Sequence, residues 1–303
     1  MCLIAFALGM RADCPLLLAA NRDEFWQRPT LPLSVWALPD GTRVCSGRDL
    51  RAGGTWLGIS QTGRVAMLTN VRSGTPDAAP RSRGELVTHW LGGAAHMPDW
   101  LHLTRQIDPQ AYGGFNLVLG DWASGTWVWL SNRPGTPTTP GSMLRLPPGW
   151  HGMLLGPGVY GLSNASLDTP WPKTLRLKTA MAKALDALTG PFAEPAPLWR
   201  ETLLQALLDR HPAPDADLPE TGIPSEKARE LSRAFVHMPD MGYGTRSTLI
   251  ARWHAPGLPV DLEEWTHAHQ PRSDCRPDGE RWSLADSAYR RISMSTWGMP
   301  TSS

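Results

Sequence analysis

The chain has 303 residues, of which 41% are hydrophobic and 19% charged, a balance typical of a globular protein. Its 29 Lys and Arg residues nearly balance its 28 Asp and Glu residues, so no basic field favours nucleic acid or an anionic lipid surface as a partner. No apolar run reaches the ~18 residues of a membrane helix, and Arg11 and Asp13 interrupt the N-terminal apolar stretch too early for a signal peptide, so we expect a cytoplasmic protein with no transmembrane segment.

Short apolar runs predict strands in the first half of the chain. Residues 2–9 and 16–21 flank a polar stretch that contains Asp13 and Pro15, which predicts a hairpin of two largely buried strands. A second hairpin is expected over residues 55–69, around a Gln-Thr-Gly turn. Further strands are predicted at residues 115–119, 126–130, 152–162 and 245–253.

Helical periodicity is stronger in the second half. Helices are predicted at residues 83–91, from Pro170 until Gly190, and at residues 198–208 and 226–236. Pro/Gly-rich stretches at residues 133–149, 191–197 and 212–224 have the composition of surface connections, and none separates two complete cores. We therefore expect one α+β domain over residues 1–255, followed by a C-terminal flank, 256–303, that is packed on the domain or partly irregular.

The cysteines and glycines give no sign of a metal or dinucleotide site. Cys2, Cys14, Cys45 and Cys275 form no CxxC pair and no Cys/His metal spacing, which also fits a reducing compartment. A GxGxxG match at residues 156–161 continues as a strand instead of opening a helix, so it does not fit a pyrophosphate loop. No metal centre and no required cofactor are predicted.

Cys2 stands directly after the initiator methionine, a position that can make it reactive. If Met1 is removed, as a small second residue permits, Cys2 carries a thiol and a free α-amine on the same residue. An α-amine with a pKa near ~8 can act as a base at neutral pH without a histidine. Cys2 is therefore a candidate nucleophile that carries its own base.

Polar residues at other strand ends could assist that nucleophile. The predicted hairpin brings Arg22 and Asp23 near Cys2, where Arg22 can lower the thiol pKa and Asp23 can hold the ammonium. Adjacent strand residues point to opposite faces, so both can line one pocket only if the chain turns there. Asn70 and Asn164 offer neutral amide donors for an oxyanion. Arg246 begins another strand.

Several blocks together resemble a known family. They are NRDEFWQRPT (21–30), GGTWLG (53–58), LTNVR (68–72), GFNL (114–117), GLSNASLDTPWPK (161–173) and YGTRST (243–248). With Cys2, this set is similar to the NRDE family, which includes the Transport and Golgi organisation proteins of animals, and it covers most of the chain to about residue 252. The resemblance implies an N-terminal-nucleophile (Ntn) hydrolase fold, a four-layer αββα sandwich of two mainly antiparallel sheets flanked by helices.

More distantly, GISQTGRVAMLTN resembles a hairpin of choloylglycine hydrolases and penicillin V acylases. The resemblance implies Cys2 as the nucleophile, assisted by Arg22, Asp23 and Arg246, with Asn70 and Asn164 stabilising the oxyanion. The same blocks supply candidate pocket residues: Asn21, Glu24, Trp56, Arg72 and Trp171.

Three interpretations stay open at this point. The first is a hydrolase of linear amides or thioesters that works through an acyl-enzyme on Cys2. The second, implied by the family's links to haem trafficking and to lipid or acyl-CoA metabolism, is a non-catalytic carrier of haem or acyl-CoA that uses some of the fifteen tryptophans as flat walls. In the third, Cys2 is only the first residue of a buried strand and the tryptophans pack the core.

Overall fold

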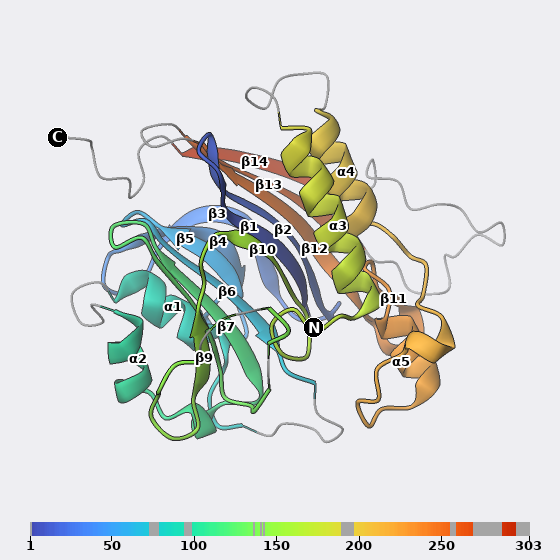
Figure 1. The fold of residues 1–303 in the computed structure, drawn as a ribbon, viewed down its shortest axis with the longest axis horizontal. Coiled ribbons are helices and arrows are strands. Elements are labelled where there is room, and N and C mark those ends of the chain that lie inside the picture. Colours follow the sequence, from blue (N-terminus) through green and yellow to red (C-terminus); the bar gives the residue numbers. More distant parts are fainter. Residues whose placement is uncertain are drawn as a thin grey trace.

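The structure is a computed structural model that describes residues 2–72, 79–93, 99–135, 137–139, 141, 143–188, 197–254, 259–268 and 287–294. Two antiparallel sheets form its centre, and helices lie on the outside (Figure 1). The first sheet has the order β10-β1-β2-β12-β13-β14, and β11 also pairs with β12. Its strands are β1 (Cys2–Arg11), β2 (Cys14–Phe25), β10 (Gly158–Leu162), β11 (His237–Met238), β12 (Tyr243–Trp253), β13 (Val260–His267) and β14 (Ser287–Met294).

The second sheet runs in sequence order from β3 to β9. Its strands are β3 (Thr30–Ala37), β4 (Arg43–Asp49), β5 (Leu57–Ser60), β6 (Arg64–Asn70), β7 (Phe115–Asp121), β8 (Thr126–Ser131) and β9 (His151–Leu154). The α-helices are α1 (Gly84–Gly92), α2 (Trp100–Gln106), α3 (Pro172–Asp186), α4 (Leu198–Leu207) and α5 (Ser225–Leu231). Short 3-10 turns lie at Pro109–Ala111, Asp215–Asp217 and Pro239–Met241.

Three buried clusters show how the layers pack. One lies between the sheets and joins residues such as Phe6 of β1 to Met67 of β6. The second packs the other face of the first sheet against α3 and α4, where Leu3 of β1 meets Leu177. The third packs the second sheet against α1 and α2. The molecule is therefore an α+β protein in four layers, helices–sheet–sheet–helices, as predicted.

Burial on both faces explains why the first strands are continuous apolar runs. In β1, Leu3 and Ala5 face the helices, while Ile4 and Phe6 face the second sheet. β1 and β2 form the predicted hairpin, with Ile4 opposite Ala20 and Cys2 opposite Arg22. The hairpin expected over residues 55–69 is also present as β5 and β6, with Gly63 at a φ of +82° in its turn.

Other expectations were only partly met. The strand predicted over residues 152–162 is two strands, β9 and β10, in different sheets. The helix predicted over residues 226–236 ends at Leu231, after which β11 begins at His237. Residues 260–267 and 287–294, assigned above to a C-terminal flank, form β13 and β14 and extend the first sheet beyond β12. Strands β3 and β4 were missed, because their half-buried sequences lack a continuous apolar run.

A close backbone contact joins the segment before β5 to the start of α1. A Cβ on Gly54 would lie 2.6 Å from the carbonyl carbon of Gly84, and one on Gly84 would lie 3.1 Å from the carbonyl oxygen of Thr55. Since both neighbours are backbone, neither can move aside without shifting its segment. The two glycines therefore allow these segments to meet.

We expect Gly54→Ala to lower the free energy of unfolding by roughly 1–3 kcal/mol, because overpacking displaces the start of α1. Gly156→Ala is the matched control, since nothing lies within 4 Å of a Cβ built there. Urea unfolding of both variants measures the difference. Equal stability of the two variants would show that the backbone contact is not tight.

Candidate active site

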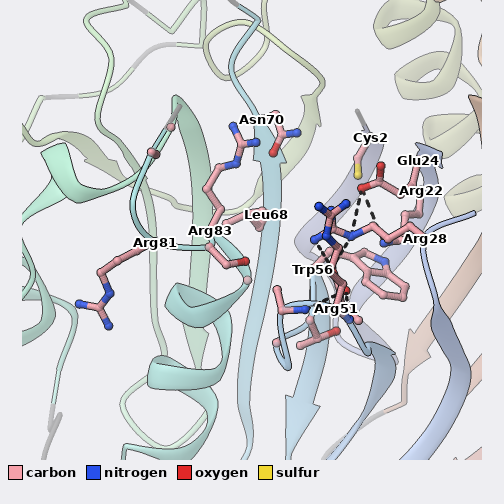
Figure 2. A pocket seen from close by; sticks show the side chains of 18 of the residues that line it. Cys2, Arg22, Glu24, Arg28, Arg51, Trp56, Leu68, Asn70, Arg81 and Arg83 are labelled. Atoms are coloured by element: carbon pink, nitrogen blue, oxygen red, sulfur yellow. Dashed lines mark hydrogen bonds and ion pairs between the residues drawn. The ribbon is translucent and has the colours of Figure 1, made fainter. Parts of the chain in front are cut away.

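A pocket of about 400 Å³ opens where β1 begins (Figure 2). The first sheet contributes Cys2, Arg22, Asp23 and Glu24, and Arg28 follows β2. The end of β4 contributes Asp49, and β6 contributes Leu68 and Asn70. The segment between β4 and β5 contributes Arg51, Ala52, Gly54, Thr55 and Trp56. Residues 79–84, which lead into α1, and Gly113 complete the described lining. The pocket thus joins both sheets.

Cys2 is the first residue of β1 and is partly exposed to the pocket. Its carbonyl accepts a hydrogen bond of 3.1 Å from the Ser163 hydroxyl, which ties the strand start to the end of β10. In the chain that begins with Met1, burial raises the pKa of the Cys2 thiol, while the positive amino terminus and Arg22 oppose that rise. The thiol is therefore mainly protonated at neutral pH, and attack by this sulfur requires a base that removes the proton.

Arg22 lies opposite Cys2 in the β1–β2 ladder and is 5% exposed. Its guanidinium carbon lies 4.1 Å from the ring centre of Trp56, a cation–π contact. Trp56 can occupy that position because residue 47 is glycine: a Cβ there would lie 2.3 Å from Cη2 of the indole. Oε2 of Glu24 lies 3.9 Å from Nη2 of Arg22, and this ion pair also holds the guanidinium beside the thiol.

Asp23 lines the same pocket as Arg22 although the two are adjacent in sequence. The partner strand β12 contains a bulge here: Thr245 pairs with Asp23 and Ser247 pairs with Arg22, so Arg246 is the extra residue. A bulge increases the local twist of a strand pair, so neighbouring side chains no longer alternate strictly between the two faces of the sheet. Asp23 Oδ1 accepts a hydrogen bond of 2.7 Å from the Thr245 hydroxyl. Burial raises the pKa of Asp23, with the amino terminus and Lys173 acting against it.

The two predicted oxyanion donors occupy different positions. Asn70 lines the pocket at the end of β6. Asn164 does not belong to the lining; its side-chain amide donates to the carbonyl of Asn70 over 2.8 Å, and its own carbonyl accepts the Arg72 amide at 2.8 Å. In this structure Asn164 therefore joins the end of β6 to the loop after β10 and positions Asn70.

The bulge residue Arg246 also lies outside the pocket lining. Its Nη1 donates to the carbonyls of Phe25, Trp26 and Arg28 at 2.9, 2.9 and 3.1 Å. Three carbonyls gathered on one guanidinium hold the turn that follows β2. Arg246 thus shapes the segment that carries Arg28 into the pocket.

Three predicted pocket residues contact other parts of the molecule. Asn21 donates to the carbonyls of Leu207 and Ala234 and accepts from Thr248, so it joins β2 to the helical layer. Arg72 lies over the ring of Trp171, 5.0 Å from its centre, and neither residue is in the lining. Glu24 and Trp56 are the two predicted binding residues that do line the pocket.

Most of the described tryptophans pack the cores. Trp90, Trp129 and Trp199 are among the largest fully buried side chains, whereas Trp56 alone among the described tryptophans lines this pocket. The high tryptophan count is thus explained mainly by packing, and the pocket wall is more polar than a set of stacked rings. Among the described residues, no group of His, Cys, Asp or Glu side chains could hold a metal ion, and no helix is long and apolar enough to cross a membrane.

Sequence reasoning missed two buried polar residues beside the pocket. Lys173, near the start of α3, is 2% exposed and donates to the carbonyl of Leu231 at 2.9 Å. Burial lowers its pKa to about 8, while Asp23 and Cys2 act against that shift. The pKa of Tyr243 is raised well above its ordinary value by burial and by the charge of Asp23. Both residues lie in the sequence blocks quoted above, Lys173 in PWPK and Tyr243 in YGTRST. Membership of these blocks is the sequence feature that could have identified them as site residues.

The comparisons with known proteins decide the family. The family described as Transport and Golgi organisation 2 matches residues 1–266. The chain belongs to this family. The human Transport and Golgi organization protein 2 homolog is 34% identical over 288 residues, covering 88% of this chain and 96% of the human protein. The mouse homolog is 32% identical over 297 residues (93% and 96%), and the Drosophila melanogaster protein 28% over 262 residues (82% and 86%).

Among solved structures, a C2A mutant of the conjugated bile acid hydrolase of Clostridium perfringens aligns over 98% of both chains, with 8% identity and a TM-score of 0.41. A likeness this distant carries no argument about the site. The family resemblance of the sequence blocks is confirmed by the family match and the animal relatives.

The buried Lys173 gives a pH-dependent signature. Its pKa of about 8 in the folded protein lies below the ~10.4 of an unfolded lysine, so between these values the unfolded chain binds more protons and the free energy of unfolding rises with pH. Relative to Lys173→Met, the wild type should gain about 3 kcal/mol between pH 8 and pH 10.4. Urea unfolding across this range measures it.

Lys183→Met, at an exposed position of the same helix, is the control and should follow the wild type at every pH. Parallel stability profiles for the wild type and Lys173→Met would contradict the assignment of a lowered pKa to Lys173.

Proposed function

We propose that this protein is an N-terminal-cysteine hydrolase that cleaves a linear amide or thioester through an acyl-enzyme on Cys2, after Met1 is removed. The observation that carries the proposal is the position of Cys2: it begins β1 at the pocket, opposite Arg22, with Asp23 and Asn70 in the same lining. A thiol, an arginine, a carboxylate and an amide donor thus converge from two sheets. This set suits attack on a carbonyl carbon.

The α-amine of the processed chain supplies the missing base. The described lining contains no histidine, so the thiol proton must pass to another group as the sulfur attacks. An unprotonated α-amine on Cys2, with an ordinary pKa near ~8, can accept it as sulfur attacks. Asp23, 2% exposed and held by Thr245, then faces an ammonium that its carboxylate stabilises.

The reaction proceeds in two balanced halves. Sulfur forms a bond to the carbonyl carbon, and the oxygen takes the electron pair while the Asn70 amide donates a hydrogen bond to it. The C–N or C–S bond then breaks, and the ammonium returns its proton to the leaving amine or thiolate, which leaves a thioester on Cys2. Water attacks this thioester, the amine accepts the water proton, and the acid departs as the thiol is protonated again. Arg22 stabilises thiolate character at the sulfur throughout.

In the carrier hypothesis, the same pocket binds a ligand and no reaction takes place. Haem or acyl-CoA would be held by the lining, and Cys2 would be a contact residue only. With a single described tryptophan in the lining, no flat cage supports haem in particular. A haem titration of the Cys2→Ala protein, read as a Soret shift, separates carriage from catalysis because it does not require the nucleophile.

Intact mass spectrometry tests the hydrolase proposal directly. We expect the mature protein to lack Met1 and to gain one hexanoyl group on Cys2 during incubation with p-nitrophenyl hexanoate. Cys2→Ala should also lose Met1, because alanine is small, yet gain no acyl group. Cys14→Ala, a change at a buried cysteine far along the hairpin from Cys2, should acylate like the wild type. Retention of Met1, or equal acylation of Cys2→Ala, would sink the proposal.

A second variant separates the nucleophile from its base. Inserting one glycine between Met1 and Cys2 keeps the thiol but converts the Cys2 nitrogen into an amide, which cannot accept a proton. We expect acylation at pH 7.5 to fall by at least about a hundredfold, the usual contribution of a positioned general base. Stopped-flow release of p-nitrophenol measures this rate. An unchanged rate would show that some other group removes the thiol proton.

A further inference from the structure

Lys173 is a buried cation that takes no part in the reaction steps proposed for Cys2. It is the second residue of α3 and is 2% exposed. Its Nζ donates to the carbonyl of Leu231 over 2.9 Å, which uses one of the three donors of the ammonium. Because burial of an ammonium is costly, a charged lysine persists at this position only where other groups compensate it.

The packing of α3 places Lys173 over the end of the first sheet at which β1 begins. Leu177 of α3 and Leu3 of β1 belong to the same buried cluster on the helical face of that sheet. Residues four apart in a helix lie on one face, so Lys173 lies one turn before Leu177 on the side that packs against the sheet. The next residue, Thr174, packs so closely on β10 that a Cβ built on Gly161 would overlap it.

Asp23 of β2 faces the same layer of the molecule. Asn21, two residues earlier, donates to two carbonyls of the helical layer, and residues two apart in a strand share a face. Asp23 is therefore turned toward the helices, although it also lines the pocket. It is 2% exposed, and its Oδ1 accepts the hydroxyl of Thr245 over 2.7 Å. A carboxylate and an ammonium are thus buried between the same sheet face and the same helical layer.

The two buried charges act on each other. Burial lowers the pKa of Lys173 to about 8, and among the groups that act against this shift Asp23 has the largest effect. Burial raises the pKa of Asp23, and in the chain that begins with Met1 the amino terminus and then Lys173 act against that rise. The other titratable or charged side chains that act on one or both of them are Cys2, Arg22, Arg72, Arg176 and Tyr243. Loss of either buried charge therefore shifts the ionisation of the other.

We propose that Lys173 is a positioning residue of the Cys2 site: its buried ammonium keeps Asp23 in the carboxylate form, so that Asp23 stabilises the ammonium that forms on Cys2 during attack. Without this cation, a carboxyl group that is 2% exposed takes up a proton more readily, and a neutral acid stabilises an ammonium far less than a carboxylate does. Lys173 is outside the described pocket lining, so it acts through Asp23 and not on the substrate. The consequence for Cys2 rests on the hydrolase proposal, whereas the coupling of the two charges does not.

NMR of the lysine side chains tests the coupling without a substrate. The chain has four lysines, so [ε-13C]lysine labelling gives four signals, and the Lys173 signal is assigned by its loss in Lys173→Arg. Asp23→Asn removes the carboxylate and keeps the side-chain shape. We expect it to move the titration midpoint of Lys173 at least about one pH unit lower, the scale of one opposite charge lost at close range.

Asp13→Asn is the matched control for this measurement. It removes the same charge from the exposed turn at the far end of the β1–β2 hairpin, and the Lys173 midpoint should not move. A lysine that only joins α3 to the end of α5, through the carbonyl of Leu231, would not respond to Asp23→Asn either. An unchanged Lys173 midpoint in Asp23→Asn therefore overturns the inference.

Acylation kinetics test the consequence for the site. Single-turnover acylation by p-nitrophenyl hexanoate at pH 7.5 gives a maximal rate constant and a half-saturating concentration. Lys173→Met should lower the rate constant at least about tenfold, the equivalent of one pH unit in the ionisation of Asp23, and leave half-saturation unchanged. Lys173→Arg keeps the positive charge and should retain most of the rate. Lys183→Met, at an exposed position of the same helix, should match the wild type.

A rate for Lys173→Met equal to that of the wild type, or a rate for folded Lys173→Arg as low as that of Lys173→Met, would show that the cation does not support the reaction. Either result overturns the positioning role. The NMR measurement on Asp23→Asn keeps the inference falsifiable if Lys173→Met does not fold.

The two experiments separate this inference from the hydrolase proposal. If Asp23→Asn moves the Lys173 midpoint but the wild type is not acylated, the coupled charges stand and the hydrolase proposal fails. If the wild type is acylated at Cys2 while neither the Lys173 midpoint nor the Lys173→Met rate changes, Cys2 is a nucleophile and the positioning role of Lys173 is wrong.

Discussion

The pairing of β1 with β2 is the constraint on which the site depends. Because both strands are buried on both faces, their register is held by apolar side chains packed against the second sheet on one side and α3 and α4 on the other. That register places Cys2 opposite Arg22 at the end of the ladder. A shift of one residue would turn Phe6 and Leu18 away from the inter-sheet core, so the core itself fixes where the thiol lies.

The pocket is built where this ladder becomes irregular. At the bulge, Arg246 of β12 has no partner residue in β2, because its neighbours Thr245 and Ser247 pair with Asp23 and Arg22. The Arg246 side chain donates hydrogen bonds to three carbonyls of the turn after β2. Strand irregularities commonly occur beside functional sites because they redirect side chains without breaking the sheet. Here the same bulge brings a carboxylate next to the thiol and stabilises the segment that carries Arg28.

Charges are buried on the helical side of the pocket. Asp23 and Lys173 are both almost fully buried, and each acts against the desolvation of the other. Burial of an isolated ion is costly, so such a pair persists only where partners surround it. Thr245 and the carbonyl of Leu231 supply hydrogen bonds to the two groups. The surroundings of Cys2 thus combine buried charged groups on the helical side with several arginines in the rest of the pocket lining.

The sequence by itself determined the strand pair that carries Cys2 and the position of one neighbouring side chain. Continuous apolar runs predicted the β1–β2 hairpin, and the hairpin alone implied that Arg22 lies near Cys2. Only the tertiary structure decided which of the other polar residues reach the pocket. Asn164 and Arg246 bind backbone carbonyls and are not part of its lining, while Arg51 and Arg83 line it from two segments that meet where Gly54 contacts Gly84. The physical reason is that strand periodicity is a local property, whereas the partner of a polar side chain depends on loops that meet only after both sheets have packed.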